Sequence, residues 1–244
     1  MAGRAIKIFP SVDELTGFAA STIIDIIILG TRRGRRTSIA LSGGTTPRAV
    51  YEKLAGISRA GALDWKAVHL FWGDERLVPP DNAGSNYRMA RQSLISRIPI
   101  PPENIHRIRG ELSAGEAAER YEGDLRDFFG AVGFPAFDLV LLGLGADGHT
   151  ASLFPHSSAL KERQRWVTTA ESGGMQRVTL TLPVLNSAEH VIFIASGKEK
   201  AEAVFRTLSG PQSPEDRPAE GVNPIRGNVL WLLDKRAASL LGGS

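Results

Sequence analysis

Short apolar segments alternate with amphipathic segments along the whole chain. Eight segments have a strand-like pattern, at residues 5–9, 37–41, 67–72, 137–142, 166–170, 178–182, 191–196 and 229–233. Helix-like segments lie between several of them, at residues 12–29, 49–57 and 114–129. An alternation of this kind predicts an α/β fold in which helices cover a mostly parallel sheet.

The sequence marks where two of these helices begin. Ser11 is followed three residues later by Glu14, and Ser113 by Glu116, and each pair has the two halves of a capping box. The segment at residues 137–142 is almost wholly apolar, as expected of a central parallel strand that is buried on both faces. We therefore place this strand in the middle of the predicted sheet.

A glycine-rich turn follows the predicted strand at residues 37–41. It places Ser42, Gly43, Gly44 and Thr45 between that strand and a helix. The N–H groups at the start of a helix attract anions, and glycines let the backbone approach a phosphate closely. The Gly-Lys-Ser/Thr ending of a Walker A loop is absent. We therefore interpret the turn as a phosphate site, and an ordinary strand-to-helix turn is the alternative.

Two further strands end in charged residues. Asp74 and Arg76 follow the strand at residues 67–72, and Lys198 follows the strand at residues 191–196. Because the carboxyl ends of parallel strands meet at one edge of a sheet, these side chains should lie near the glycine-rich turn. Lys198 is a candidate for a second phosphate contact. For Asp74 and Arg76, a solvent-exposed charged turn is the alternative.

A second glycine-rich segment follows the buried strand at residues 137–142. Residues 143–148 read Gly-Leu-Gly-Ala-Asp-Gly and match the fingerprint of dinucleotide-binding loops. That fingerprint should open a long helix, whereas Pro155 ends any helix here after about one turn. The segment also contains His149, and an imidazole side chain can serve as a general acid or base. These features favour a catalytic loop, and a nucleotide-dependent oxidoreductase remains an alternative.

The remaining histidines have no spacing that indicates a metal site. His69, His106 and His190 lie in or beside apolar segments and are interpreted as structural. His156 follows Pro155, and we do not favour a substrate contact for it. We expect neither a metal nor a cofactor.

Composition narrows the class of protein. Of the 244 residues, 42% are hydrophobic and 23% charged, and no shift in composition marks a boundary, so we expect one domain over residues 1–244. The chain has no cysteine, which excludes a disulfide framework, a thiolate metal site and a cysteine nucleophile. The start of the chain lacks the apolar core of an export signal, and residues 23–29 are too short to span a bilayer. We expect a cytoplasmic protein with no membrane contact.

The charge distribution gives no sign of a nucleic-acid partner. The formal net charge is +3, and the dense basic cluster at residues 32–36 has no interleaved aromatic residues. A solvated helix end is the favoured interpretation of this cluster. Residues 209–226 are rich in proline, glycine and charge, which predicts a long surface loop, and loops of that length are often functional.

Taken in order, these segments resemble the 6-phosphogluconolactonase family, which belongs to a larger group that includes the glucosamine-6-phosphate isomerases, or deaminases. The matching segments lie at residues 41–47, 72–76, 85–87, 142–155, 177–181, 196–198 and 231–234. They run in order over nearly the whole chain. The resemblance is therefore far more specific than either glycine motif alone.

The resemblance implies a three-layer α/β/α fold around a Rossmann-like sheet, no organic cofactor, and a small phosphosugar lactone as substrate. The implied reaction is the hydrolysis of 6-phosphogluconolactone in the oxidative pentose phosphate pathway. His149 matches the proposed general base, and Asp147 matches its acidic neighbour. The residues expected around the phosphosugar are Ser42, Gly43, Gly44, Thr45, Asp74, Arg76, Arg177 and Lys198.

One residue separates the two chemistries of this larger group. The deaminases usually have Asn-Glu-Pro where this chain has Leu-Phe-Pro, ending at Pro155. Phe154 cannot supply the carboxylate of that glutamate. The resemblance therefore favours lactone hydrolysis over isomerisation, and a deaminase remains the nearest alternative.

Overall fold

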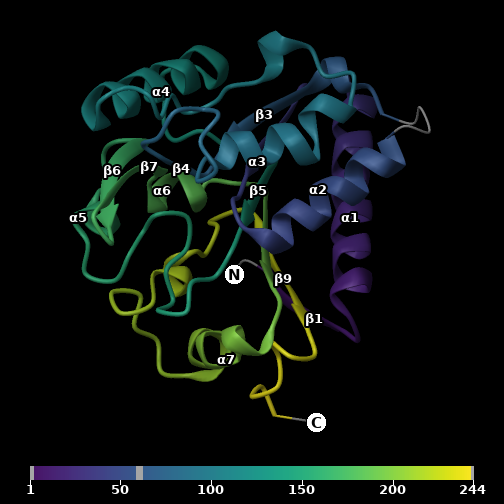
Figure 1. Ribbon diagram of the computed structural model, residues 1–244, viewed down its shortest axis with the longest axis vertical. Helices are drawn as coiled ribbons and strands as arrows, with labels where there is room; N and C mark the ends of the chain where they lie inside the picture. The colour runs from purple at the N-terminus through teal and green to yellow at the C-terminus, as the bar shows by residue number, and fades with distance from the viewer. Residues whose placement is uncertain (1–2, 59–62, 243–244) are drawn as a thin grey trace.

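A six-stranded parallel sheet forms the centre of the computed structural model, which describes residues 3–58 and 63–242 (Figure 1). The spatial order of its strands is β1, β9, β8, β5, β2, β3, and neighbouring strands in this order pair in parallel. The α/β fold predicted from the alternation of segments is confirmed. The strands are β1 (Gly3–Phe9), β2 (Thr37–Leu41), β3 (Val68–Trp72), β5 (Leu139–Leu142), β8 (His190–Ala195) and β9 (Asn228–Asp234).

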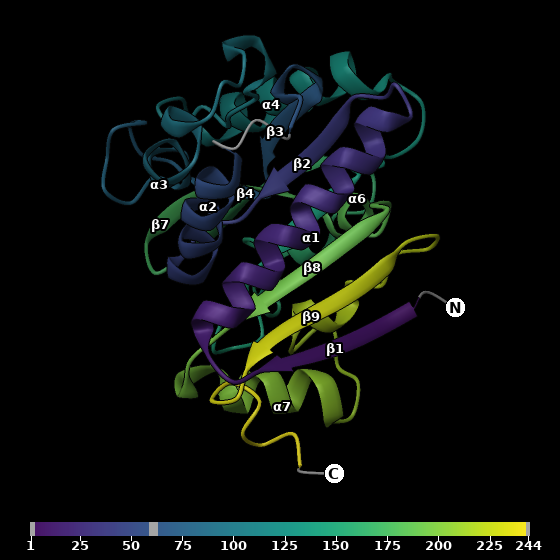
Figure 2. The ribbon, with the colours of Figure 1, turned by 90° about the vertical axis from the view of Figure 1, so that its right-hand side faces the viewer.

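Helices lie around this sheet, and Figure 2 shows α1 and α2 over one of its faces. The predicted capping box at Ser113 and Glu116 is present. At the start of α1 only half of the predicted box forms: the Ser11 side chain accepts from the Glu14 N–H, and the Glu14 carboxylate accepts from the Ser11 hydroxyl and not from its backbone N–H. In the described part of the chain, no helix is long and apolar enough to cross a membrane. The helices are α1 (Val12–Arg32), α2 (Thr45–Ser58), α3 (Asn86–Ser93), α4 (Ala114–Phe129), α5 (Ser158–Lys161), α6 (Leu182–Leu185) and α7 (Ala201–Ser209).

Helix α2 begins four residues before the start predicted from the sequence. Its first residue is Thr45, and Pro47 lies in its first turn. A proline is tolerated there because the N–H groups of a first helical turn have no partner within the helix. The helix therefore starts directly at the glycine-rich turn, which brings its positive end to the edge of the sheet.

A second, three-stranded antiparallel sheet was not predicted. It consists of β4 (Asp74–Arg76), β7 (Met175–Leu180) and β6 (Val167–Ser172), in that order. Gly73 connects the two sheets, because its N–H donates to the Leu41 carbonyl and its own carbonyl accepts from the Leu180 N–H. The two segments expected to extend the central sheet, at residues 166–170 and 178–182, belong to this smaller sheet instead.

The chain reverses its direction of travel across the sheet between β2 and β5. From β2 it moves outward to the edge strand β3, whereas from β5 it moves the other way to β8 and β9. Ligands of open α/β sheets bind beyond the carboxyl ends of the strands at such a switch point. The two glycine-rich loops follow β2 and β5, so both lie at this point.

Candidate active site

A pocket of about 280 Å³ lies at this switch point. Its volume is near the lower end of the range of small-ligand sites, about 300–1,000 Å³, and suits a ligand of monosaccharide size better than a dinucleotide. Residues from four loops line it, namely Ser42, Gly43, Gly44, Thr45, Thr46, Pro47, Asp74, Arg76, Asn86, Gly143, Leu144, Gly145, His149, Ala151, Arg177, Ile194, Ala195 and Lys200.

The wall after β2 is a rigid turn at the start of α2. The buried Tyr51 hydroxyl accepts from the Ser42 N–H and donates to the Ser42 carbonyl, both at 2.9 Å. Gly43 has no room for a side chain, because a Cβ there would lie 2.0 Å from Asn86 Oδ1. Gly44 has a φ of 110°, which favours glycine. These constraints aim the first N–H groups of α2 at the pocket, where they can bind an anion.

The wall after β3 contains two buried carboxylates. Glu75 accepts hydrogen bonds from the N–H groups of Asn86 and Tyr87, both at 2.7 Å, and from the Ser85 hydroxyl, so it fixes the start of α3. Burial raises the pKa of Glu75, although these hydrogen bonds oppose the shift. Asp74 Oδ2 accepts from the Ser152 hydroxyl at 2.6 Å. These residues form a buried network, not the solvent-exposed turn that was the alternative.

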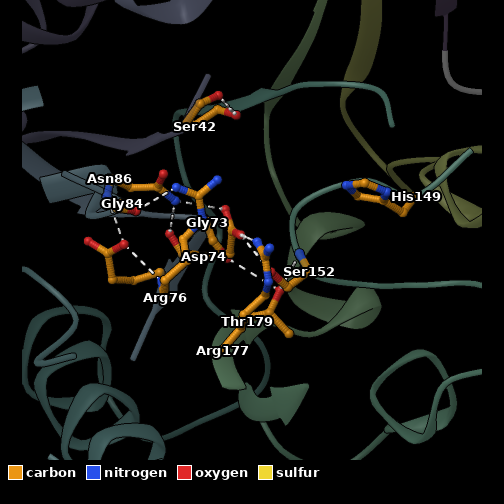
Figure 3. Close-up of polar contacts among 12 residues, drawn as sticks. Ser42, Gly73, Asp74, Arg76, Gly84, Asn86, His149, Ser152, Arg177 and Thr179 are labelled. Atoms are coloured by element: carbon orange, nitrogen blue, oxygen red, sulfur yellow. Dashed lines mark hydrogen bonds and ion pairs between the residues drawn. The ribbon is translucent and has the colours of Figure 1, made fainter. Parts of the chain in front are cut away.

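Two arginines add positive charge to the same wall. Arg76 on β4 and Arg177 on β7 are direct cross-strand partners, an arrangement that is unfavourable for like charges unless an anion compensates it. Burial, followed by the charge of Arg76, lowers the pKa of Arg177, and Asp74, whose Oδ2 lies 3.9 Å from Arg177 Nη1, offsets part of that shift. Figure 3 shows both guanidinium groups beside Asp74. Among the described residues, the buried Nε atoms of both arginines lack a hydrogen-bond partner.

His149 lies on the loop after β5, apart from this cluster (Figure 3). Its Nδ1 is 2.5 Å from Asp147 Oδ1, and the same oxygen accepts from the His149 N–H at 3.1 Å. Burial acts to raise the pKa of Asp147, but the hydrogen bonds and charge of His149 outweigh burial and lower it. Asp147 is therefore a carboxylate at neutral pH, which can only accept a hydrogen bond. Nδ1 must carry the proton of neutral His149, and the lone pair is on Nε2.

The aromatic ring of Phe154 lies next to His149. The Phe154 ring lies 4.6 Å from the His149 ring, centroid to centroid, and the Arg177 guanidinium lies 5.5 Å from the Phe154 ring centroid. Phe154 therefore lies between the candidate base and one of the arginines. It contributes an apolar contact and has no group that can exchange a proton.

The structure brings most of the expected site residues to one pocket. Eight of them line it: Ser42, Gly43, Gly44, Thr45, Asp74, Arg76, His149 and Arg177. Asp147 lies behind His149 and contacts its ring. Lys198 is the exception, since it does not line the pocket and Lys200 does. Gly197, with a φ of 97°, turns the chain into a short 3-10 helix here, and this turn brings the second lysine to the pocket.

Three residues with clear structural roles were not predicted from the sequence. Asn86 packs against Gly43 and donates to the Asp74 carbonyl at 2.9 Å. Ser152 bonds the catalytic loop to Asp74, and Lys200 lines the pocket. Asn86 and Ser152 lie inside segments that carried the family resemblance, which was the available signal, but their partners are distant in the sequence.

Comparisons with known proteins show the family to which the chain belongs. The family model described as glucosamine-6-phosphate isomerases/6-phosphogluconolactonase matches residues 10–231. The chain belongs to this family. It is 44% identical to a 6-phosphogluconolactonase of Synechocystis over 86% of both chains, and 41% identical to human 6-phosphogluconolactonase over 97% of this chain and 93% of the human one.

Solved structures of the family have the same fold. A 6-phosphogluconolactonase from Trypanosoma cruzi superimposes with a TM-score of 0.87 and 34% sequence identity, over all of this chain and 99% of the other. The family description covers both an isomerase and a lactonase chemistry. The pocket residues of this chain therefore have to distinguish between the two.

Proposed function

We propose that the protein hydrolyses 6-phosphogluconolactone to 6-phosphogluconate in the cytoplasm, with His149 as the general base. The observation that carries the proposal is the contact between His149 Nδ1 and Asp147 Oδ1, because it leaves the basic Nε2 for a water molecule. Relatives at 41–44% identity that carry the name 6-phosphogluconolactonase support the same reaction. The substrate is then a small phosphosugar, which fits the volume of the pocket.

The phosphate binds at the start of α2. The free N–H groups after Ser42 and the positive end of the helix favour a dianion there, and Lys200, which also lines the pocket, adds positive charge. Arg177 and Arg76 contribute further positive charge. Holding the phosphate fixes the distance between the lactone ring and His149, which converts the attack of water into a positioned reaction.

Hydrolysis then proceeds by addition and elimination. Nε2 of His149 takes a proton from water while the water oxygen bonds to the lactone carbonyl carbon. The carbonyl oxygen becomes an oxyanion, for which Arg76 is the candidate partner. When the bond from that carbon to the ring oxygen breaks, the imidazolium returns its proton to the ring oxygen. The product is the open-chain acid, which loses a proton to solvent.

The deaminase alternative is disfavoured by Phe154. Its ring occupies the place beside His149 where the resemblance puts a glutamate in the deaminases, and it can neither accept nor donate a proton. The oxidoreductase alternative is disfavoured by the length of the loop, since only turns and a bridge follow Gly148 before Pro155. The pocket volume also suits one sugar phosphate better than a dinucleotide.

The decisive assay compares enzyme-dependent lactone loss with the spontaneous background. 6-Phosphogluconolactone is followed by ³¹P NMR at pH 7, and we expect its conversion to 6-phosphogluconate to accelerate in proportion to protein concentration. Loss at the background rate, together with binding of 6-phosphogluconate, would indicate a binding module. Release of ammonia from glucosamine 6-phosphate would instead favour the deaminase, and tight NAD binding in a fluorescence titration would favour the oxidoreductase.

A further inference from the structure

The loop at residues 209–226 packs against the segment that carries His149. Within it, a short 3-10 helix spans Pro218–Gly221. The Ala219 N–H donates to the Gly148 carbonyl at 3.0 Å, one residue before the histidine. The His156 N–H donates to the Glu215 carbonyl at 3.1 Å. The two hydrogen bonds therefore hold the catalytic segment at both ends.

The catalytic segment needs such support because its backbone is strained. Gly148, Ala151 and His156 have φ values of 85°, 48° and 58°, so three of nine consecutive residues are left-handed. For residues with a Cβ, this conformation costs about 1–2 kcal/mol each. Strained residues persist only where surrounding contacts impose their conformation. One such contact is the hydrogen bond from Ser152, within the segment, to Asp74 on β4. The other contacts come from the loop at residues 209–226.

Arg217 links the loop to Gly148. Its side chain is 18% exposed, and its Cγ and Cα lie 2.9 and 3.1 Å from the position that a Cβ on Gly148 would take. Arg217 Nε donates to Glu220 Oε1, and Nη2 donates to the Pro211 carbonyl. The second Glu220 oxygen accepts from the Ser213 N–H at 2.5 Å. The Arg217 guanidinium and the Glu220 carboxylate thus connect different parts of the loop to one another next to Gly148.

The other ion pairs of the loop are at the surface. His156 Nε2 lies 3.0 Å from Asp216 Oδ1, and Lys161 Nζ lies 3.5 Å from Glu215 Oε1, and all four side chains are more than half exposed. Exposed pairs contribute only about 0–1 kcal/mol. Glu220, in contrast, is 4% exposed, so its pair with Arg217 is shielded from water. The Arg217–Glu220 pair is therefore the contact most able to fix the loop.

We propose that Arg217 is a positioning residue for the hydrolysis, acting through Gly148 on the orientation of His149. This inference rests on the proposed function of His149. Arg217 is not among the residues that line the pocket, so its effect is expected to pass through Gly148. By packing beside Gly148 and keeping Ala219 in place, it holds the imidazole at the distance that attack by water requires. Small displacements of a reacting group cost up to about a hundredfold in rate.

The test is a steady-state comparison of Arg217→Ala with the native protein. We expect kcat to fall about tenfold, because the loop loosens behind Gly148. KM and the Kd of 6-phosphogluconate, measured by calorimetry, should change by less than about twofold, because the phosphate site at α2 is untouched. Arg217→Lys keeps the stem against Gly148 and the charge opposite Glu220, and should recover most of the lost rate.

Arg206→Ala is the matched control. Arg206 forms an ion pair with Glu202 at 2.7 Å on α7, both side chains are exposed, and neither lines the pocket. This variant should keep the native kcat. If Arg217→Ala does not fold, as judged by its melting curve, Glu220→Gln replaces it and should give the same pattern with a loss of about threefold.

Two outcomes would overturn the inference. The first is a folded Arg217→Ala variant with native kcat. The second is a rise in KM with kcat unchanged, which would make the loop part of substrate binding. A failure of the proposed function is separate, because it would appear in the native protein as lactone loss at the background rate, whatever Arg217 does.

Discussion

Replacing Asp147 with asparagine removes one charge beside His149 and little else. The Asp147 Oδ1 atom accepts from both the His149 N–H and Nδ1, and the amide oxygen of asparagine can accept both bonds. The tautomer with the lone pair on Nε2 is therefore retained. What is lost is the attraction between the carboxylate and the imidazolium that forms when water is deprotonated.

The size of this attraction follows from exposure. Two unit charges 4 Å apart interact by about 1 kcal/mol in water and by about 4 kcal/mol in surroundings typical of a protein surface. The His149 side chain is 30% exposed and that of Asp147 is 52% exposed, so solvent screening puts the interaction near the lower end, at about 1–2 kcal/mol. Since about 1.4 kcal/mol corresponds to a factor of ten, kcat should fall about five- to thirtyfold. The loss of about ten-thousandfold seen for a buried triad aspartate comes from the wrong histidine tautomer, which is not expected here.

The assay is steady-state lactone hydrolysis at pH 7 with the background rate subtracted. Asp216→Asn is the control, because Asp216 forms a similar contact with His156 at 3.0 Å outside the pocket. It should change kcat by less than about twofold. A loss beyond about a thousandfold for Asp147→Asn would mean that the carboxylate acts in an environment much drier than its exposure indicates. A native rate would mean that it does not stabilise the imidazolium at all.

Two further predictions concern the scaffold. Gly148→Ala puts a Cβ within 3.1 Å of Arg217 atoms at a residue whose φ is 85°. We expect the unfolding free energy to fall by about 1–3 kcal/mol and kcat to fall at least tenfold. Gly115→Ala, in open space on α4, is the control and should lower neither. Burial, then the charge of His106, lowers the pKa of His69 to about 4. Because the unfolded chain binds this proton near pH 6.5, the stability that neutral His69 contributes is complete above pH 6.5 and is lost as the pH falls towards 4. In urea unfolding, the free energy of unfolding of His69→Phe should therefore decrease less between pH 6.5 and 4 than that of the native protein. An equal decrease would contradict this origin.

Local sequence patterns were enough to predict the strands of the central sheet and the starts of α1 and α4. The predicted strand at residues 137–142 contains β5, whose four residues are all buried, and both serine caps are present. The strands depend on the spacing of apolar residues, and the helix caps depend on hydrogen bonds between residues at most four positions apart. Both kinds of information are present in a short stretch of sequence.

Features that depend on distant contacts were not predictable. Asp74 and Glu75 look like an exposed charged turn in the sequence, but β4 pairs with β7 about a hundred residues later and buries them. Their carboxylates are satisfied by donors such as Ser152, which no local pattern connects to them. The choice between Lys198 and Lys200 likewise depends on the turn at Gly197, which a motif match does not specify.

The account depends most on His149, and its replacement by alanine is the most direct measurement. Removing the general base should lower kcat for 6-phosphogluconolactone at least a hundredfold, since such catalysis contributes about a hundredfold to ten-thousandfold. The Kd for 6-phosphogluconate and the melting temperature should stay close to the native values, because the proposed phosphate site is at the start of α2 and the His149 side chain is 30% exposed. A His149→Ala variant that hydrolyses the lactone at the native rate would contradict the central claim.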